Sequence, residues 1–380
     1  MDGELNCDSA VQFGPCTRIE PRFKACPEPG RVTLIFGPSG SGKSTILRML
    51  AGLIPPSEGH IHCGSLLWND AAKGVCLPPQ QRKIGFLFQN YALFDHLTVK
   101  QNLSYALRKM NPATREERVM EVARMLEITD LLGQYPRTLS GGQAQRTALG
   151  RSIAPWPKWL FLDEPLSALD EPLRARLRKE LRELLKRIGI PAIIVTHDSR
   201  EIESLGDDLL LMNSGRVIAA GSVNEVLFNP GSITAARSLG LENVFPIEGL
   251  DRNDRDEWLL QIEGWKCLLP KAATKFPSDT APSHVIIPPE EIIILKEVET
   301  CPENCLELST TLVTLNKNGA LLQMEFQQPK GMLVQSTPQW LGSPLPHAGD
   351  CLRLGIPFDS LRFLSPTPSS SESTAFSTKG

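Results

Sequence analysis

The sequence has no apolar run long enough to cross a lipid bilayer. Its longest, such as "PAIIVT" and "VIIPP", fall far short of the roughly 20 residues that a membrane-spanning helix needs. The first residues, "MDGELNCDSAVQFG", contain neither a basic region nor an apolar region, so we expect no signal peptide. The formal net charge of −3 gives no basic excess, and no nucleic-acid partner is expected.

The nine cysteines also lack the spacing of a disulfide framework. We therefore expect reduced thiols in a cytosolic protein. The closest pair, Cys301 and Cys305 in "CPENC", predicts a loop with two thiols. A metal or redox role for this pair is the alternative.

Up to about residue 240, short β-rich apolar runs alternate with helical patterns. The runs that predict strands are "RVTLIF", "KIGFLF", "KWLFL", "PAIIVT" and the two halves of "LLLMNSGRVIAAG". This alternation predicts an α/β domain with a largely parallel sheet. Residues 171–188 show helical spacing. We expect the basic residues of this helix, interleaved with Glu180 and Glu183, to form a solvated outer face: Arg174, Arg178, Arg182 and Lys186.

After residue 241 the pattern changes to short alternating runs separated by proline and glycine. Examples are "WLLQIEG", "HVIIPPEEIIIL", "TLVTLNKNGALLQMEF" and "CLRLGIPF", with a turn at "NKNG". This pattern of short alternating runs and turn residues predicts a small all-β domain. The final segment is rich in Ser, Thr and Pro and is expected to be disordered. The predicted divisions are residues 1–240, 241–365 and 366–380.

The segment "GPSGSGKST" follows a predicted strand and opens a helical run, which is the context a phosphate-binding loop requires. Glycines let backbone N–H groups point at phosphate oxygens, and the helix N-terminus adds further donors. Lys43 is expected to reach the β and γ phosphates and Ser44 to bind Mg²⁺. The predicted phosphate-binding residues are Gly37, Pro38, Ser39, Gly40, Ser41, Gly42, Lys43, Ser44 and Thr45.

Polar side chains follow three further predicted strands. Asp163 and Glu164 end "WLFLDEP", and ligands bind at such strand ends in α/β sheets. We expect Asp163 to hold Mg²⁺ and Glu164 to polarise the attacking water. His197 is expected to contact the γ-phosphate, and Gln89 to touch Mg²⁺ or the water. A structural histidine and an ordinary exposed glutamine are the alternatives.

The turn "LSGGQ" supplies no nucleophile, metal ligands or base. With "GPSGSGKS", Gln89, "LFLDEP", "SALD" and His197 in this order, residues 32–221 resemble the nucleotide-binding subunit of ABC transporters. The resemblance implies ATP and Mg²⁺ as cofactors and a head-to-tail homodimer. The turn of one copy would close on the γ-phosphate held by the other through Ser140, Gly141, Gly142 and Gln143.

The same resemblance assigns further roles. The loop that joins the two sites across the dimer would contain Ser167, Ala168, Leu169 and Asp170. A helical subdomain, residues 90–152, would contact integral-membrane permease subunits, served indirectly by a substrate-binding protein. The subunit would lie peripherally on the cytoplasmic face of the inner membrane. The adenine-stacking position of the family falls near Cys16, with Phe13 as a neighbour.

Residues beyond 241 resemble the small OB-like β-barrel accessory domain of importer ATPases. The motifs resemble those of the molybdate and sulfate group most, so the expected cargo is molybdate or a related oxyanion such as sulfate or tungstate. Iron, polyamine and sugar importers are alternatives, and so is a soluble ABC protein outside transport. The accessory domain is expected either to support the dimer or to sense the imported oxyanion.

Overall fold

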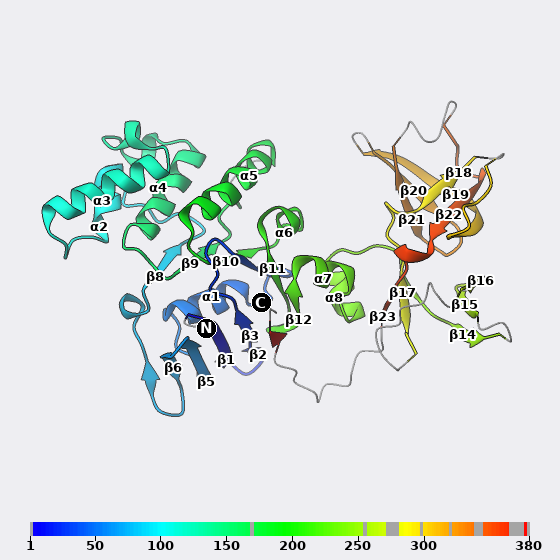
Figure 1. The fold of residues 1–380 in the computed structure, drawn as a ribbon, viewed down its shortest axis with the longest axis horizontal. Helices are drawn as coiled ribbons and strands as arrows, with labels where there is room; N and C mark the ends of the chain where they lie inside the picture. The colour runs from blue at the N-terminus through cyan, green and yellow to red at the C-terminus, as the bar shows by residue number, and fades with distance from the viewer. Residues whose placement is uncertain are drawn as a thin grey trace. The chain divides into compact units, whose positions relative to one another are not determined.

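The computed structural model describes residues 3–167, 171–253, 257–270, 281–296, 299–318, 321–337, 345–364 and 376–377 (Figure 1). The described residues form two compact units. One lies within residues 1–226 and includes the strand at 376–377, and the other begins at Leu227. The boundary falls within α7 (Val223–Phe228), and α8 (Ile233–Ser238) belongs to the second unit. The functional division near residue 240 stays a prediction.

A six-stranded sheet is the centre of the first unit. Its order is β12-β11-β4-β10-β9-β8, and all neighbours are parallel except the hairpin β11–β12. The strands are β4 (Val32–Phe36), β8 (Ile84–Leu87), β9 (Trp159–Asp163), β10 (Ala192–Thr196), β11 (Asp208–Asn213) and β12 (Arg216–Ser222). The predicted largely parallel sheet is confirmed. Every residue of β4, β9 and β10 is buried, which explains why these strands read as continuous apolar runs.

A second sheet, which the sequence analysis missed, packs on the same core. It contains β1 (Leu5–Phe13), β2 (Thr17–Ile19), β3 (Arg22–Ala25), β5 (Glu58–Cys63), β6 (Leu66–Asp70), β7 (Val75–Cys76) and β24 (Phe376–Ser377). Helix α1 (Lys43–Ala51) buries Leu47 between this sheet and the first one. There it meets Ile61 of β5 and Phe161 of β9 in one cluster. The rest of the tail predicted to be disordered lies outside the described residues.

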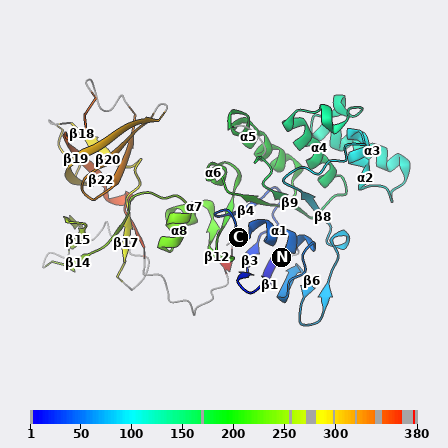
Figure 2. The same cartoon turned by 180° about the vertical axis from the view of Figure 1, so that it is seen from behind.

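Three helices of the first unit gather together in both views (Figures 1 and 2). They are α2 (Val99–Tyr105), α3 (Pro112–Met125) and α4 (Gly141–Ile153), with the short 3-10 turns Thr129–Leu131 and Pro136–Thr138 between them. They approach closely at Gly150, where an added Cβ would lie 2.6 Å from Leu103. No helix in the described part of the chain is both long and apolar enough to cross a membrane.

The arginines of α5 (Glu171–Ile188) correct one prediction. Arg178 is buried, and the side chains of Arg174 and Arg182 are less than one fifth exposed. Arg182 pairs with Asp207, and Arg174 lies 3.6 Å from Asp198. These side chains therefore face acidic residues of the loops before and after α6 (Arg200–Leu205). The solvated face predicted for them is confirmed only for Lys186, because acidic partners distant in sequence draw the arginines inward.

The second unit confirms the predicted all-β domain after residue 241, and the strand pairs of its sheets are antiparallel. Its sheets have the orders β13-β17-β23, β14-β15-β16 and β18-β22-β19-β20-β21. Their strands are β13 (Val244–Pro246), β14 (Gly249–Arg252), β15 (Trp258–Ile262), β16 (Trp265–Leu269), β17 (His284–Ile286), β18 (Ile293–Leu295), β19 (Cys305–Asn318), β20 (Leu321–Phe326), β21 (Met332–Ser336), β22 (Cys351–Pro357) and β23 (Arg362–Leu364).

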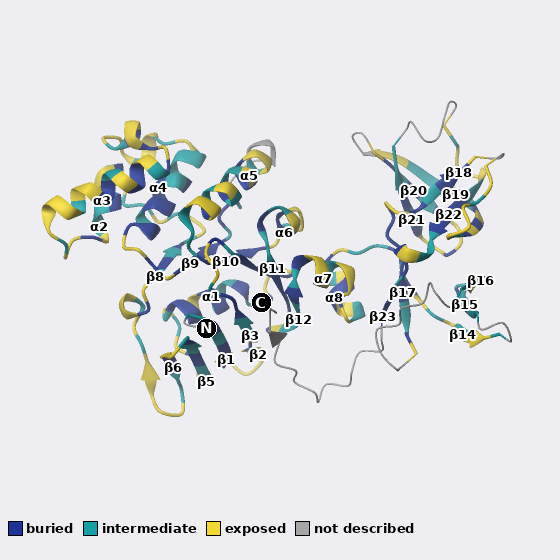
Figure 3. Cartoon of the chain, viewed as in Figure 1, coloured by how far each residue is buried: buried dark blue, intermediate teal, exposed yellow. Residues whose placement is uncertain are grey.

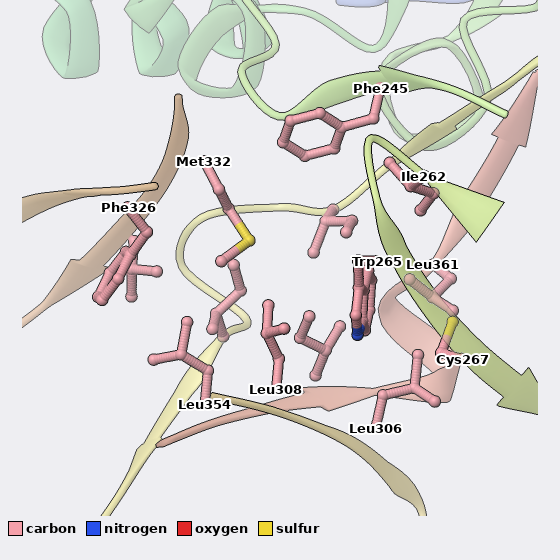
Figure 4. Packing of buried hydrophobic residues seen from close by; sticks show 14 of the residues in the cluster. Phe245, Ile262, Trp265, Cys267, Leu306, Leu308, Phe326, Met332, Leu354 and Leu361 are labelled. Carbon is pink, nitrogen blue, oxygen red and sulfur yellow. The ribbon is translucent and has the colours of Figure 1, made fainter. Parts of the chain in front are cut away.

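One hydrophobic cluster joins these sheets. Figure 4 shows Phe245, Trp265, Leu308 and Met332 directed toward each other from different strands. Every second residue of β16 and β20 is buried, and the residues between them are exposed or half-buried. Figure 3 shows this mixture of burial across the unit. Cys301 lies in a loop and Cys305 begins β19, and all nine cysteines of the chain are free thiols.

Arg82 is buried to 1% exposure and ties the C-terminus of α1 to the second sheet. Its guanidinium donates to the carbonyl oxygens of Met49 (2.9 Å), Leu50 (2.7 Å), Leu77 (2.8 Å) and Trp68 (3.1 Å). The last carbonyls of a helix have no partner within the helix. Arg82 supplies a donor to Leu50 O, joins the Gly52 N–H at Met49 O, and places a cation at the negative end of the helix dipole.

Arg82→Met should therefore destabilise the first unit strongly. The carbonyl groups of Met49 and Trp68 would keep backbone N–H donors, but those of Leu50 and Leu77 would lose the donor that Arg82 provides. We expect this loss to lower the thermal midpoint of that unit by about 10 °C. Because the chain has two units, differential scanning calorimetry should follow the first-unit transition separately. Arg22→Met, at a half-exposed arginine 3.2 Å from Asp8, is the control and should change the midpoint little. Equal shifts for the two variants would contradict the capping role.

Candidate functional site

The loop between β4 and α1 needs glycine where other backbone comes close. A Cβ at Gly37 would lie 2.2 Å from the carbonyl oxygen of Met212 in β11. Gly42 has φ 99° and would meet Ile19 of β2 at 2.8 Å. Both neighbours belong to other segments, so the loop is shaped by the strand beside it and by β2. The predicted loop therefore lies between the two sheets of the first unit.

Lys43 is 5% exposed, and its ammonium closes this loop. It donates to the carbonyl oxygens of Gly37 and Pro38, both at 2.9 Å. Burial lowers the pKa of Lys43, and the nearby carboxylates of Glu164 and Asp163 oppose that shift. A buried cation at the start of α1, beside its N-terminal N–H groups, makes this loop a place for an anion.

Ser44 and Asp163 bring two oxygen ligands together. The Ser44 hydroxyl donates to Oδ1 of Asp163 at 2.7 Å, and Arg48 lies 3.8 Å from Oδ2. Asp163 is 1% exposed, and burial raises the pKa of its carboxyl. The described residues contain no cluster of three or more His, Cys, Asp or Glu side chains for a metal. One hydroxyl and one carboxylate instead fit a hard cation that completes its shell with phosphate and water, as Mg²⁺ does.

Glu164 lies between Gln89 and His197. Its Oε2 accepts from Nε2 of Gln89 at 3.0 Å, and its Oε1 is 3.1 Å from Nδ1 of His197. Nε2 of Gln89 is also 3.4 Å from the Ser167 hydroxyl. Glu164 has the left-handed φ of 46°, which the hydrogen bond from its N–H to Val195 O holds in place. The structure thus brings together Glu164, predicted to polarise the attacking water, His197, predicted to contact the γ-phosphate, and Gln89, predicted to touch Mg²⁺ or the water.

The turn "LSGGQ" begins a helix and carries its own cap. Helix α4 begins at Gly141, with Ser140 as its N-cap. The Ser140 hydroxyl accepts from Gln143 N–H at 3.4 Å, and Gln143 Oε1 accepts from Ser140 N–H at 2.9 Å. This reciprocal pair is a capping box. Serine and glutamine at this spacing therefore have a structural role within the chain.

Other predicted residues are placed as follows. Phe13 and Cys16 are exposed in the β1–β2 hairpin, whose β2 carries the Ile19 that packs against Gly42. Ser167 follows Glu164 and belongs to the same site. The other members of the expected dimer loop lie outside the described residues: Ala168, Leu169 and Asp170.

Arg151 is a residue to which the sequence analysis gave no role. From α4 it donates to the carbonyl oxygens of Tyr91 (2.8 Å) and Ala92 (2.6 Å). Both acceptors have left-handed φ angles, and they directly follow the segment that carries Gln89. Arg151 therefore fixes that segment to α4, the helix that Ser140 caps. No local pattern predicts this contact, because donor and acceptors are about 60 residues apart.

A family model described as "ABC transporter" matches residues 23–167. The trehalose/maltose import ATP-binding protein MalK of Thermococcus litoralis is 45% identical over 213 residues, 56% of this chain and 57% of its own. The probable sulfate/thiosulfate import ATP-binding protein CysA of Chlorella vulgaris is 41% identical over 215 residues, 56% of this chain and 89% of its own. Other relatives are named for import of sn-glycerol-3-phosphate, spermidine/putrescine and molybdenum.

The match spans 57–62% of the length of the relatives named for trehalose/maltose, sn-glycerol-3-phosphate and spermidine/putrescine import. A solved structure, the dimeric post-hydrolysis state of the ATP-binding cassette MJ0796 bound to ADP and Pi, is 27% identical. The likeness covers 58% of this chain and 98% of that one, with a TM-score of 0.48.

The buried carboxylate of Asp163 should cost the ligand-free chain stability. Because burial raises its pKa, the protonated form is the one the fold favours. This contribution is present at low pH and is lost as the pH rises through the raised pKa. Asp163→Asn keeps an acceptor for Ser44 and removes the charge. At neutral pH we expect a gain of about 1 kcal/mol, or about 2–4 °C in the midpoint.

Differential scanning fluorimetry of the ligand-free chain between about pH 4 and about pH 8 would measure the gain. The difference between variant and parent should shrink toward low pH, where Asp163 is protonated. A variant less stable than the parent at every pH would contradict the assignment.

Proposed function

The chain belongs to the ABC transporter family, and from this premise we propose that it is the ATP-binding and ATP-hydrolysing subunit of an importer. The single observation that carries the proposal is the Glu164 carboxylate held between Gln89 and His197, beside the Ser44–Asp163 pair. An anionic acceptor in that place can orient a water molecule toward a terminal phosphate and accept its proton. This geometry fits hydrolysis better than nucleotide binding alone.

The chain's own groups divide the task. Lys43 and the N–H groups that begin α1 bind and neutralise the phosphates of ATP. Gln89 and His197 orient the carboxylate of Glu164, and the exposed His197 ring lies where it could donate to the γ-phosphate. Ser44 and Asp163 are the residues that would hold Mg²⁺. That ion, when bound with ATP, supplies charge neutralisation at the phosphate oxygens.

We propose that the ATP site is completed by a second copy of the chain. Ser140 is exposed at the N-terminus of α4, where backbone N–H groups are available to an anion. Gly142 supports this view. A Cβ there would meet only Leu177, at an ordinary 3.6 Å, and yet a helical glycine costs about 1 kcal/mol relative to alanine. Nothing described in the same chain requires this glycine, whereas a phosphate group approaching from a partner copy would.

The helical segment α2–α4 is the surface that we propose contacts the permease subunits, which places the protein peripherally on the cytoplasmic face of the inner membrane. Arg151 links this segment to the strand end that carries Gln89. A displacement of α4 would therefore reach the water-binding residues directly, which is the connection that a transport ATPase needs.

For the cargo we propose an oxyanion of the molybdate, sulfate or tungstate class. Support comes from relatives named for sulfate/thiosulfate and molybdenum import, at 41% and 43% identity. Relatives named for sugars and polyamines make those cargoes the alternatives. The test is the ATPase activity of the complex with its permease and binding protein, measured with molybdate, tungstate, sulfate, maltose and putrescine. Stimulation by the sugar or the polyamine alone would overturn the oxyanion assignment.

Glu164→Gln should bind ATP but turn it over at least about 100-fold more slowly, because the amide keeps the shape and cannot accept the proton of the water. Phosphate release and titration with a fluorescent ATP analogue would measure the two quantities. Hydrolysis close to that of the parent would exclude Glu164 as the base.

Ser140→Arg should prevent ATP-dependent dimerisation, because a bulky cation would occupy the space meant for the partner's γ-phosphate. The Glu164→Gln background, which retains ATP, allows light scattering to compare samples with and without the nucleotide. Ser140→Thr keeps the hydroxyl of the cap and should still dimerise. If Ser140→Arg dimerises as well as Ser140→Thr does, this turn is not the closing element.

A further inference from the structure

Five residues form a closed circuit of contacts around the loops after β9 and β10. The Ser167 hydroxyl and N–H donate to Glu164 O at 3.0 and 3.2 Å. The next two contacts are made by Arg174 of α5: its Nη2 donates to Ser167 O at 3.4 Å, and its Nη1 lies 3.6 Å from Asp198 Oδ2. Asp198 is the residue after His197, whose Nδ1 returns to Glu164 at 3.1 Å.

We propose that Arg174 is a positioning residue for hydrolysis, holding the loop of Glu164 and the loop of His197 in one fixed arrangement. This inference rests on the proposed function. Arg174 touches neither Glu164 nor His197 directly. It acts through the Ser167 carbonyl on one side and the Asp198 carboxylate on the other, so it sets the distance between the two side chains that face the water.

The arginine side chain suits this bridge because two different nitrogens make the two contacts. A lysine would have to reach both partners from its single nitrogen, without the planar fork that lets the guanidinium reach them from two separate positions. The bridge is also sheltered. The side chains of Arg174 and Asp198 are 19% and 9% exposed, so the ion pair is screened less than a surface pair.

The loop of His197 is held from a second side, which leaves Arg174 to determine its position relative to Glu164. Asp198 N–H donates to the Thr196 hydroxyl at 3.0 Å. Arg200 binds the Asp198 carboxylate at 2.9 and 3.0 Å from its exposed outer side. Arg200 therefore shares the carboxylate with Arg174, but among the described contacts it has none with Ser167. The two arginines form a matched pair for an experiment.

The test compares Arg174→Gln with Arg200→Gln in the full chain. We expect Arg174→Gln to lower kcat by about 10- to 100-fold, with ATP affinity within about threefold of the parent. Lys43, Ser44 and Asp163 lie outside the circuit, so binding should survive. Arg200→Gln should change kcat by less than about threefold. A variant that only lost stability would lower the apparent kcat and the apparent ATP affinity together, because both depend on the folded fraction.

A second measurement, the NMR signal of the His197 ring, does not depend on ATP hydrolysis. The chain has six histidines, so the ring resonances are few enough to assign by substituting His197. In the ligand-free protein, at one fixed pH, the His197 signal should shift in Arg174→Gln and remain near the parent position in Arg200→Gln. Unchanged kcat together with an unchanged His197 signal in Arg174→Gln would overturn the proposal.

If Arg174→Gln does not fold, Arg174→Lys tests the same proposal. It keeps the charge and should still lose about tenfold in kcat and move the His197 signal, because one nitrogen replaces two that occupy different positions. Parent-like values for both would overturn the bridge. If the parent itself does not hydrolyse ATP, the proposed function fails, and the His197 signal alone then decides whether Arg174 positions the two loops.

Discussion

The parallel register of four neighbouring strands is the constraint on which the site depends. Val195 of β10 pairs with Asp163 of β9, and Thr196 pairs with Phe36 of β4. Leu87 of β8 pairs with Leu162. The strands therefore end at one edge of the sheet, and the segments that follow them carry the phosphate loop, Glu164, His197 and Gln89. A slip of one residue in any pair would turn the side chains of that strand to the opposite face. The buried apolar residues of these strands prevent such a slip, so the core fixes the chemistry.

The two helices that we propose to face phosphate are both held at their far ends by buried arginines. Arg82 binds the last carbonyls of α1, and Arg118 donates to Ile153 and Ala154 at the end of α4, both at 3.0 Å. The Arg118 guanidinium also lies 3.9 Å from the Trp156 ring. A cation at a helix C-terminus neutralises the partial negative charge there. With that end satisfied, the N-terminal N–H groups are the remaining open end of each dipole.

The sequence predicts the parts of this site whose signals are local. The phosphate loop, the strand ends at Asp163 and His197, and the α/β class follow from short patterns of apolar, glycine and acidic residues. The strands β1 to β3 and β5 to β7 were missed. Their hairpins are local, but they form one sheet only because β1 pairs with the distant β5, as Ala10 with Glu58. Arg174 was read as a solvated surface residue for the same reason. Its partners follow other strands, and helical periodicity shows only that it is not on the apolar stripe.

The turn "LSGGQ" has a structural and a functional explanation, and hydrogen-bond chemistry makes the two compatible. The capping box uses only acceptor oxygens, the Ser140 hydroxyl oxygen and Gln143 Oε1. A serine hydroxyl still has its proton to donate, and a glutamine amide still has two. The cap therefore fixes the orientation of both side chains and leaves their donors for a phosphate. Alanine at Ser140 would lose the cap and the donor together, whereas glycine at position 142 serves the cap in no way. In the proposed dimer, Ser140 and Gln143 thus order the turn within their own chain, and Gly142 allows the partner's phosphate to approach it.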